Sequence, residues 1–165
     1  MRPFEKAIEA LDGIPGISRT NAEQILCETG IDMSRFPTDK HFASWAALCP
    51  GNNETGGKRK SGKTRKGNMA LKAALTQAAI SASRTKGTYF NAMYHRLAVR
   101  RGKNKAIIAV AHAILVVIYH MLKEESSYRD LGINYYNEIN RQAIVKRSVK
   151  RLESMGFKVT IEPAA

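Results

Sequence analysis

The stretch Ala106–Tyr119, AIIAVAHAILVVIY, is the longest apolar run of the 165-residue chain. Its fourteen residues, interrupted only by His112, are fewer than the roughly 20 that a helix needs to span a bilayer. We therefore expect this run to lie within a helix over 103–123 that is buried at the centre of the fold. No membrane partner is expected.

Six further stretches carry the periodicity of amphipathic helices. They cover residues 4–11, 20–29, 38–48, 69–84, 88–101 and 138–155. Thr38 is suited to begin the third of these helices and Gly30 to end the second. The sequence predicts an all-α bundle of about seven helices with one short C-terminal strand at 157–161. Residues 1–37 form a predicted helix-hairpin-helix, and residues 38–165 a second helical domain packed with it as one unit.

Apolar side chains at helical spacing indicate which faces are buried. We expect Trp45 to lie in the core, because it follows Phe42 by three residues on an apolar face. In the last helix, Val145, Val149 and Leu152 are expected to face inward. The aromatics of the 88–101 helix lie among bases and fit either a half-buried seam or stacking on nucleobases; they are Tyr89, Phe90 and Tyr94.

Positive charge is concentrated in the middle of the chain. The formal net charge is +13, yet the stretch from Thr55 to Lys123 carries fifteen Lys and Arg and no Asp or Glu. The flanks hold the other twelve bases and all fourteen acids. Such a field of one sign indicates a polyanionic partner, and nucleic acid is the leading candidate.

The centre of this basic region is Pro50–Asn68, PGNNETGGKRKSGKTRKGN, a glycine-rich stretch without a large apolar residue. This composition favours neither a strand nor an amphipathic helix, so we predict a basic loop held out by the helices. Beside a phosphate chain its charges are neutralised and counterions are released. The predicted nucleic-acid contacts are Lys58, Arg59, Lys60, Lys63, Arg65, Lys66 and Asn68, and the hydroxyls of the loop are Thr55, Ser61 and Thr64.

A second predicted phosphate contact precedes the loop. The stretch LDGIPGISRTNAEQIL resembles a helix-hairpin-helix, in which a tight turn presents backbone N–H groups to a DNA phosphate. Gly16, Ile17 and Ser18 would make this contact, although Ser18 stands where the motif usually has its second glycine. The alternative is a helical hairpin that only packs or dimerises.

The remaining polar residues point to a cytoplasmic protein without a metal site of its own. Cys27 and Cys49 form no CxxC pair and are interpreted as reduced, buried thiols. The N-terminal sequence contains acids and no long apolar core, which is not the pattern of a signal peptide. We interpret His112 and His120 as core or rim histidines rather than metal ligands.

Three stretches together resemble a known family: the hairpin IPGISRTNAEQIL, the central FASWAALCPGNNETGGKRKSGKTRKGN and the tail from YRDLGINYY to MGFKV. They are similar to the C-terminal transposase domain of bacterial insertion-sequence elements related to the Piv/MooV DNA invertases. The resemblance implies a DNA recombinase in two pieces, with a RuvC-like domain that holds magnesium through four acidic residues. That domain is absent from this sequence, so the magnesium is expected from another chain or another part of the protein.

In this family the C-terminal domain supplies a serine that attacks the DNA phosphodiester and holds a covalent intermediate. The position of that serine aligns with Thr55, and Ser61 is the second candidate. An alcohol needs activation by a metal or a base, and cations must offset the charge on phosphorus. Some members are guided by a structured RNA, and the joining of two DNA ends implies a homo-oligomer.

Two other functions fit the same residues. A non-catalytic nucleic-acid-binding module, or the remnant of a degenerate transposase, would need the bases but not the nucleophile. A basic helical protein of the ribosome or chromosome is less favoured, because simple phosphate binding does not require the threonine and glycines that precede the bases.

Overall fold

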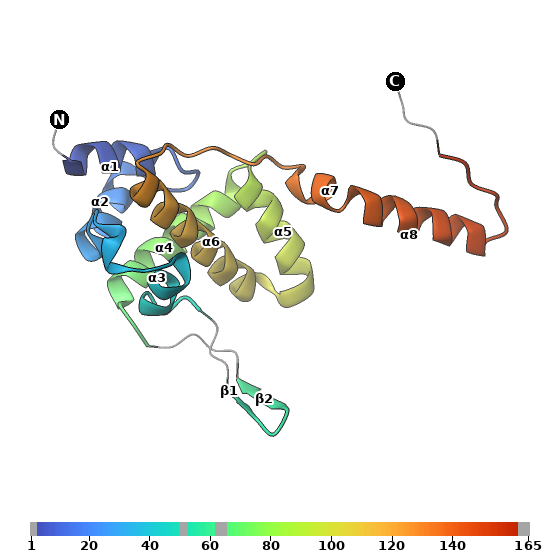
Figure 1. Cartoon of the computed structure of the whole chain (residues 1–165), viewed down its shortest axis with the longest axis horizontal. Helices are drawn as coiled ribbons and strands as arrows, with labels where there is room; N and C mark the ends of the chain where they lie inside the picture. The colour runs from blue at the N-terminus through green and yellow to red at the C-terminus, as the bar shows by residue number, and fades with distance from the viewer. Residues whose placement is uncertain (1–2, 50–52, 62–65, 162–165) are drawn as a thin grey trace.

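The computed structural model describes residues 3–49, 53–61 and 66–161. Within these ranges the fold is all-α, with eight α-helices, one turn of 3-10 helix and a two-stranded β-hairpin that stands apart from them (Figure 1). In chain order the elements are α1 Pro3–Asp12, α2 Arg19–Thr29, η1 Met33–Arg35, α3 Asp39–Trp45, β1 Asn53–Thr55, β2 Lys58–Ser61, α4 Met69–Arg84, α5 Tyr89–Arg101, α6 Lys103–Glu124, α7 Tyr135–Ile139 and α8 Arg141–Ser154.

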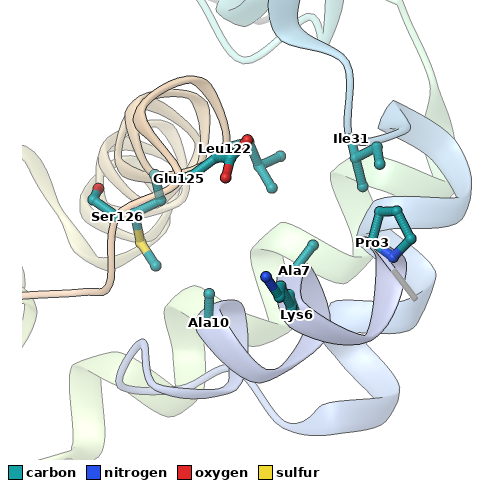
Figure 2. A pocket seen from close by; sticks show the side chains of 9 residues that line it. Pro3, Lys6, Ala7, Ala10, Ile31, Leu122, Glu125 and Ser126 are labelled. Carbon is teal, nitrogen blue, oxygen red and sulfur yellow. The ribbon is translucent and has the colours of Figure 1, made fainter. Parts of the chain in front are cut away.

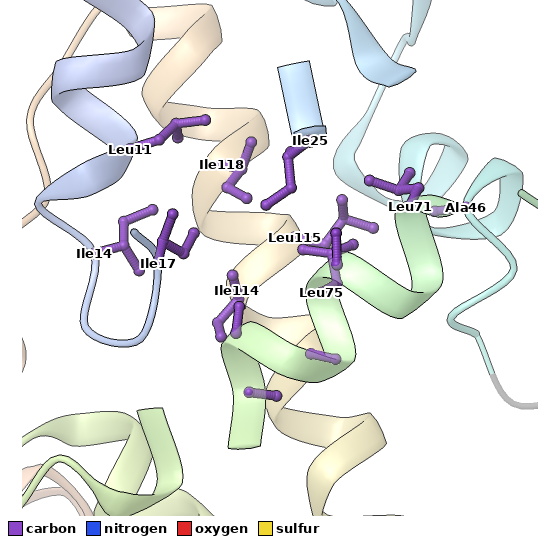
Figure 3. Close-up of a cluster of buried hydrophobic side chains, with 14 of the residues drawn as sticks. Leu11, Ile14, Ile17, Ile25, Ala46, Leu71, Leu75, Ile114, Leu115 and Ile118 are labelled. Atoms are coloured by element: carbon purple, nitrogen blue, oxygen red, sulfur yellow. The ribbon is translucent and has the colours of Figure 1, made fainter. Parts of the chain in front are cut away.

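Helix α6 is the central helix, as predicted, and contacts α1, α3, α4, α5 and η1. It is 22 residues long, one residue longer than predicted. By length and composition alone this helix could cross a membrane, although its longest apolar run is only fourteen residues. The burial of α6 against its neighbours is what marks it as the core helix. Figure 3 shows the cluster around it, including Leu11, Ile14, Ile25, Leu71, Leu75, Ile114, Leu115 and Ile118.

The predicted helices of residues 4–101 are confirmed, except that the third ends at Trp45 rather than at residue 48. Local capping explains where four of them begin. Four helices start after a residue whose side-chain oxygen accepts a hydrogen bond from the backbone N–H three positions on. These residues are Ser18 for α2, Thr38 for α3, Asn68 for α4 and Thr88 for α5. The caps satisfy backbone N–H groups that the helix itself leaves without partners.

The C-terminal third differs from the prediction. Helix α8 forms, but none of its residues is buried, and Val145 and Leu152 are 39% and 40% exposed rather than inward. The helix points away from the bundle (Figure 1). Residues 157–161 form no strand, because a lone strand needs a partner and no neighbouring strand lies beside them in the described part of the chain.

Helix α7 connects α8 to the bundle through aromatic contacts. The Tyr136 hydroxyl donates a hydrogen bond to the Tyr89 hydroxyl at 3.0 Å, and the two rings stack. The guanidinium of Arg96 lies 4.9 Å from the centre of the Tyr136 ring. Phe90 is fully buried, and Tyr89 and Tyr94 pack against the core, so these aromatics form a half-buried seam.

Two further expectations about burial were wrong. Trp45 is 41% exposed, although its ring contacts the rings of Phe36 and Phe42. Cys27 is exposed on α2 and Cys49 is only partly buried, so the two free thiols are not core residues. Cys27 follows the buried Ile25 and Leu26 in the helix and therefore falls on its outer face.

Candidate nucleic-acid interface

A β-hairpin stands where the sequence predicted a loop throughout. Strands β1 and β2 pair antiparallel and are joined by Gly56 and Gly57, whose φ angles are 59° and 73°. Positive φ at both central residues is the requirement of a type I′ turn, whose twist matches that of paired strands. The loop prediction therefore fails for residues 53–61, and the Gly-Gly pair was the signal that indicated a hairpin. We call residues 50–68, which contain this hairpin, the arm.

Thr55 and Lys58 flank the turn at the tip of the arm. They are directly opposite in the register of the two strands, and both are exposed. Residues opposite each other project on the same face of a hairpin with Cβ atoms about 4.5–5.5 Å apart. The tip therefore presents one hydroxyl beside one ammonium group, clear of the helices (Figure 1).

The other predicted residues of the arm are described to different extents. Arg59, Lys60 and Ser61 lie in β2, where the backbone is described and the side chains are not; the register shifts at Lys60, a β-bulge. Lys63 and Arg65 lie outside the described residues. Lys66 is exposed at the base of the arm.

The base of the arm is held against the bundle. A Cβ atom on Gly67 would collide with the Cβ of Ala47, a buried residue in the left-handed conformation at φ 54°. Asn68 caps α4 by accepting a hydrogen bond from the Leu71 N–H at 3.0 Å. Its amide nitrogen also donates to the carboxylate of Glu28 on α2. The predicted nucleic-acid contact Asn68 thus joins the base of the arm to two helices.

A second group of bases lies at the corner where α5 turns into α6. This corner lies on the same side of the bundle as the arm in Figure 1, whereas α1 lies on the opposite side, and the bases at the corner are exposed. They are Arg100, Arg101, Lys103 and Lys105. These bases belong to the basic middle region of the sequence but were not among the predicted contacts, although the pattern RRGKNK around a helix-ending glycine was a usable signal.

The helical hairpin of α1 and α2 uses its turn mainly for packing. Residues Ile14 to Ile17 form a tight turn closed by a hydrogen bond from the Ile17 N–H to the Ile14 carbonyl at 3.0 Å. Gly16 has φ 93° and lies so close to α4 that a Cβ atom would collide with the backbone of Ala78 and Ala82. Ile17 is buried, and of the three predicted contact residues only Ser18 is exposed.

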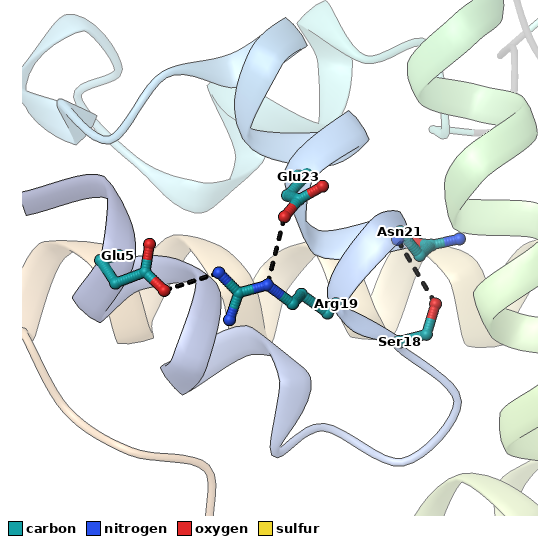
Figure 4. A network of polar contacts seen from close by, with 5 residues as sticks. All are labelled: Glu5, Ser18, Arg19, Asn21 and Glu23. Atoms are coloured by element: carbon teal, nitrogen blue, oxygen red, sulfur yellow. Dashed lines mark hydrogen bonds and ion pairs between the residues drawn. The ribbon is translucent and has the colours of Figure 1, made fainter.

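Ion pairs surround the exposed end of this hairpin (Figure 4). Arg19 contacts the Glu5 carboxylate at 2.6 Å and the Glu23 carboxylate at 3.3 Å, and the pair with Glu5 raises the pKa of Arg19. Residues 3–30 carry five acids and two bases, a net charge of −3. The electrostatic field around Ser18 is therefore less favourable to phosphate than the field around the arm.

The structure does not bring the two predicted contact regions together. Asn68 bonds to Glu28 near the C-terminal end of α2, whereas Ser18 caps its N-terminal end. At 1.5 Å per residue, the ten-residue separation places these points about 15 Å apart. The arm and the hairpin turn would contact different phosphates, and the phosphate contact of the hairpin stays a prediction.

A model of the transposase IS116/IS110/IS902 family matches residues 8–95 of the chain. These 88 of 165 residues run from α1 into α5 and include the helical hairpin and the arm. Helices α6 to α8 lie beyond the match. No curated protein matches the chain.

Proposed function

The chain belongs to the transposase IS116/IS110/IS902 family, and we propose that it is the DNA-binding, nucleophile-bearing part of an insertion-sequence transposase. The family supports a role in insertion-sequence transposition. We propose that the arm and the bases of the α5–α6 corner contact a sugar–phosphate strand. The observation that carries this proposal is the cross-strand pair of Thr55 and Lys58 at the exposed tip of the arm.

The chemistry proposed for the tip is a transesterification. The Thr55 Oγ1 attacks a DNA phosphorus, so that an Oγ1–P bond forms while one P–O bond to deoxyribose breaks. The hydroxyl proton is taken up by a base, and the departing deoxyribose oxygen leaves as a hydroxyl after it gains a proton. Lys58 offsets the negative charge that builds on phosphorus during the attack.

Among the described residues, no three His, Cys, Asp or Glu side chains lie together as a group that could hold a metal ion. In relatives of the Piv/MooV invertases a RuvC-like domain holds the magnesium, and we propose the same division of labour here. Activation of the hydroxyl would then come from that domain, and the reaction would take place in the cytoplasm. A structured RNA presents the same phosphates as DNA, so the arm would accept either.

Binding is tested by fluorescence anisotropy of labelled DNA and RNA over a range of salt concentrations. With six or more phosphate contacts, the affinity is expected to fall by roughly three orders of magnitude between 50 and 200 mM salt. The absence of any binding to DNA or RNA in dilute buffer would refute the proposal.

The nucleophile is tested by mixing the chain with an acidic magnesium domain of a related transposase and labelled DNA. A covalent protein–DNA adduct that survives denaturing electrophoresis is expected, and Thr55→Ala should abolish it without weakening the binding of DNA. Thr55→Ser should raise the yield, because serine lacks the β-methyl group that crowds attack on phosphorus. Thr85→Ala, which removes another exposed hydroxyl, is the matched control. Unchanged adduct formation by Thr55→Ala would exclude Thr55.

A non-catalytic nucleic-acid-binding module is the second candidate. The β-methyl group of Thr55 favours it, since a tip that only bonds to phosphate tolerates threonine as well as serine. Both candidates predict binding that weakens with salt. Only the transposase predicts a covalent adduct. If the unmodified chain and the Thr55→Ser variant both bind DNA without forming an adduct, the non-catalytic binding module is the better description.

A further inference from the structure

Helix α8 carries positive charge that lies outside the arm and outside the α5–α6 corner. The helix has five bases and one acid, and every residue in it except Val149 is exposed. No ion pair among the described residues involves this helix, whereas the charge of Arg19 on α2 is taken up by two carboxylates. The bases of α8 are therefore available to a polyanion.

The pocket between α1 and the C-terminal end of α6 does not offer such a field (Figure 2). Its volume is about 400 Å³, and its charged lining consists of Lys6 and Glu125. One charge of each sign attracts a polyanion no more than it repels one. Beyond the arm and the corner, α8 is therefore the surface to consider for nucleic acid.

Four of the bases form two rows along one side of α8. At about 100° per residue, Lys146 and Lys150 lie about 40° apart in one row, and Arg147 and Arg151 lie about 40° apart in the other. The two rows are about 100° apart around the helix, and Ala143 falls between them. This side of α8 thus has cations along both edges and a small side chain in the middle.

Such a side fits the major groove of B-form DNA. The groove is about 12 Å wide and admits an α-helix, whose diameter with side chains is about 10–12 Å. A helix in the groove has a phosphate chain on either side, so each row of bases faces one strand. The 14 residues of α8 extend about 21 Å, which is about six base pairs of duplex.

Entry into a groove requires a helix that stands clear of the rest of the protein. Helix α8 has no buried residue and points away from the bundle (Figure 1). Its first turn is nevertheless anchored, because only Asn140 separates it from α7, and Tyr136 of α7 is bonded to and stacked on Tyr89 of α5. A helix that is already formed and anchored at one end binds with a smaller loss of conformational entropy than a flexible tail.

The geometry favours duplex DNA over RNA and over single strands. The major groove of an A-form RNA duplex is deep and narrow, and protein side chains do not read it. A single strand has no groove with a phosphate chain on each side. The opposite side of α8, which includes Val145, is apolar and takes no part in this contact.

We propose that the basic side of α8 binds in the major groove of double-stranded DNA, as a second contact that is separate from the arm. This contact rests on the proposed function, since it assumes that the chain binds DNA, and it adds the form of DNA that α8 recognises. The arm contacts a sugar–phosphate strand, and α8 holds a segment of duplex.

The test measures binding of the full chain to three labelled probes of one sequence: a DNA duplex, an RNA duplex and single-stranded DNA, each of roughly 20 nucleotides per strand, about two helical turns. The variant neutralises both rows and is Lys146→Gln/Arg147→Gln/Lys150→Gln/Arg151→Gln. For duplex DNA, the plot of log binding constant against log salt concentration should become less steep by about 3–4, because each lost phosphate contact removes about 0.9. For the other two probes the change should be less than about 1.

A pair of single variants tests which side of α8 meets the DNA. Ala143→Glu places a carboxylate between the two rows of bases and should weaken binding of duplex DNA about tenfold or more. Val145→Glu is the matched control, because it adds the same charge to the opposite side of the same helix, and it should change the affinity less than about threefold. Both positions are exposed, and circular dichroism verifies that the helices are intact.

Three outcomes would overturn the proposal: an unchanged salt dependence in the fourfold variant, the same change with all three probes, or equal effects of Ala143→Glu and Val145→Glu. Lys58→Gln, at the tip of the arm, gives an independent measurement. If it reduces the salt dependence while the α8 variants do not, the α8 contact is wrong and the proposed function stands. If the unmodified chain binds none of the probes in dilute buffer, both are wrong.

Discussion

Gly67 packs directly on Ala47, and this contact holds the base of the arm against the bundle. Ala47 follows α3 in the left-handed conformation, which turns the chain towards the arm, and Gly67 precedes the cap of α4. The contact connects the two ends of the segment that carries Thr55 and Lys58. An arm with a fixed base can direct its tip at one place on a bound strand.

Gly67→Ala is expected to destabilise the chain by about 1–3 kcal/mol, because the new methyl group meets the Ala47 side chain. Urea denaturation measures the loss. The double variant Gly67→Ala/Ala47→Gly should recover most of it, since it removes the colliding methyl group and puts glycine in a left-handed position. Equal stability of the single and double variants would show that the contact is not what holds the base of the arm.

Gly16→Ala is expected to cost about 2–5 kcal/mol, because the added Cβ atom collides with the backbone of α4 and the φ of 93° is unfavourable to alanine. Thermal denaturation provides the measurement. Gly30→Ala is the matched control, with φ 70° but no atom near the added Cβ, and should cost about 1–3 kcal/mol from backbone strain alone. If the two variants lose the same stability, packing of the turn on α4 is not the cause.

The plot of log binding constant against log salt concentration is expected to become less steep by about 1 in Lys58→Gln, because one phosphate contact is lost. The measurement is DNA binding at several salt concentrations. Lys40→Gln removes an exposed charge from α3, outside the basic region, and should leave the slope unchanged. A slope unaffected by Lys58→Gln would mean that the tip does not contact the strand.

Partial burial of His112 lowers its pKa, while Asp39 opposes the shift. The unfolded chain therefore takes up a proton at this position before the folded chain does. The free energy of unfolding should fall as the pH drops below the ordinary histidine value of 6.5. His112→Gln should flatten this dependence between pH 7.5 and 5.5, as measured by urea denaturation at each pH. If the free energy of unfolding changes with pH in the same way in both proteins, His112 is not the source of the dependence.

Tyr136→Ala is expected to release α7 from α5, because it removes both the stacking on Tyr89 and the contact with Arg96. Amide hydrogen exchange in 135–139 should become about tenfold faster, the equivalent of roughly 1.4 kcal/mol. Tyr136→Phe, which loses only the hydrogen bond to Tyr89, should change the rate by less. Equal rates in all three proteins would show that the aromatic contacts do not anchor α7.

Much of the site was visible in the sequence, yet the arrangement of its parts was not. The excess of bases from Thr55 to Lys123 and the hydroxyl ahead of them are properties of the linear chain. The juxtaposition of Thr55 with Lys58 depends on the turn at Gly56 and Gly57, which pairs the two residues across a hairpin. The bases of the α5–α6 corner fall on the same side as the arm only because α5 and α6 pack together.

The sequence by itself determined that α1 to α6 form and, for α2 to α5, where they begin, because a helix forms from hydrogen bonds four residues apart and from caps within one turn. It also determined the buried stripe of α4, where Leu71, Leu75 and Ala78 recur at helical spacing. Only the tertiary structure decided that Gly16 packs on α4 and that α8 leaves the bundle. Those outcomes depend on which surfaces, distant in sequence, pack together. The periodicity of a segment indicates that one face is apolar, but it does not indicate which other element packs against that face.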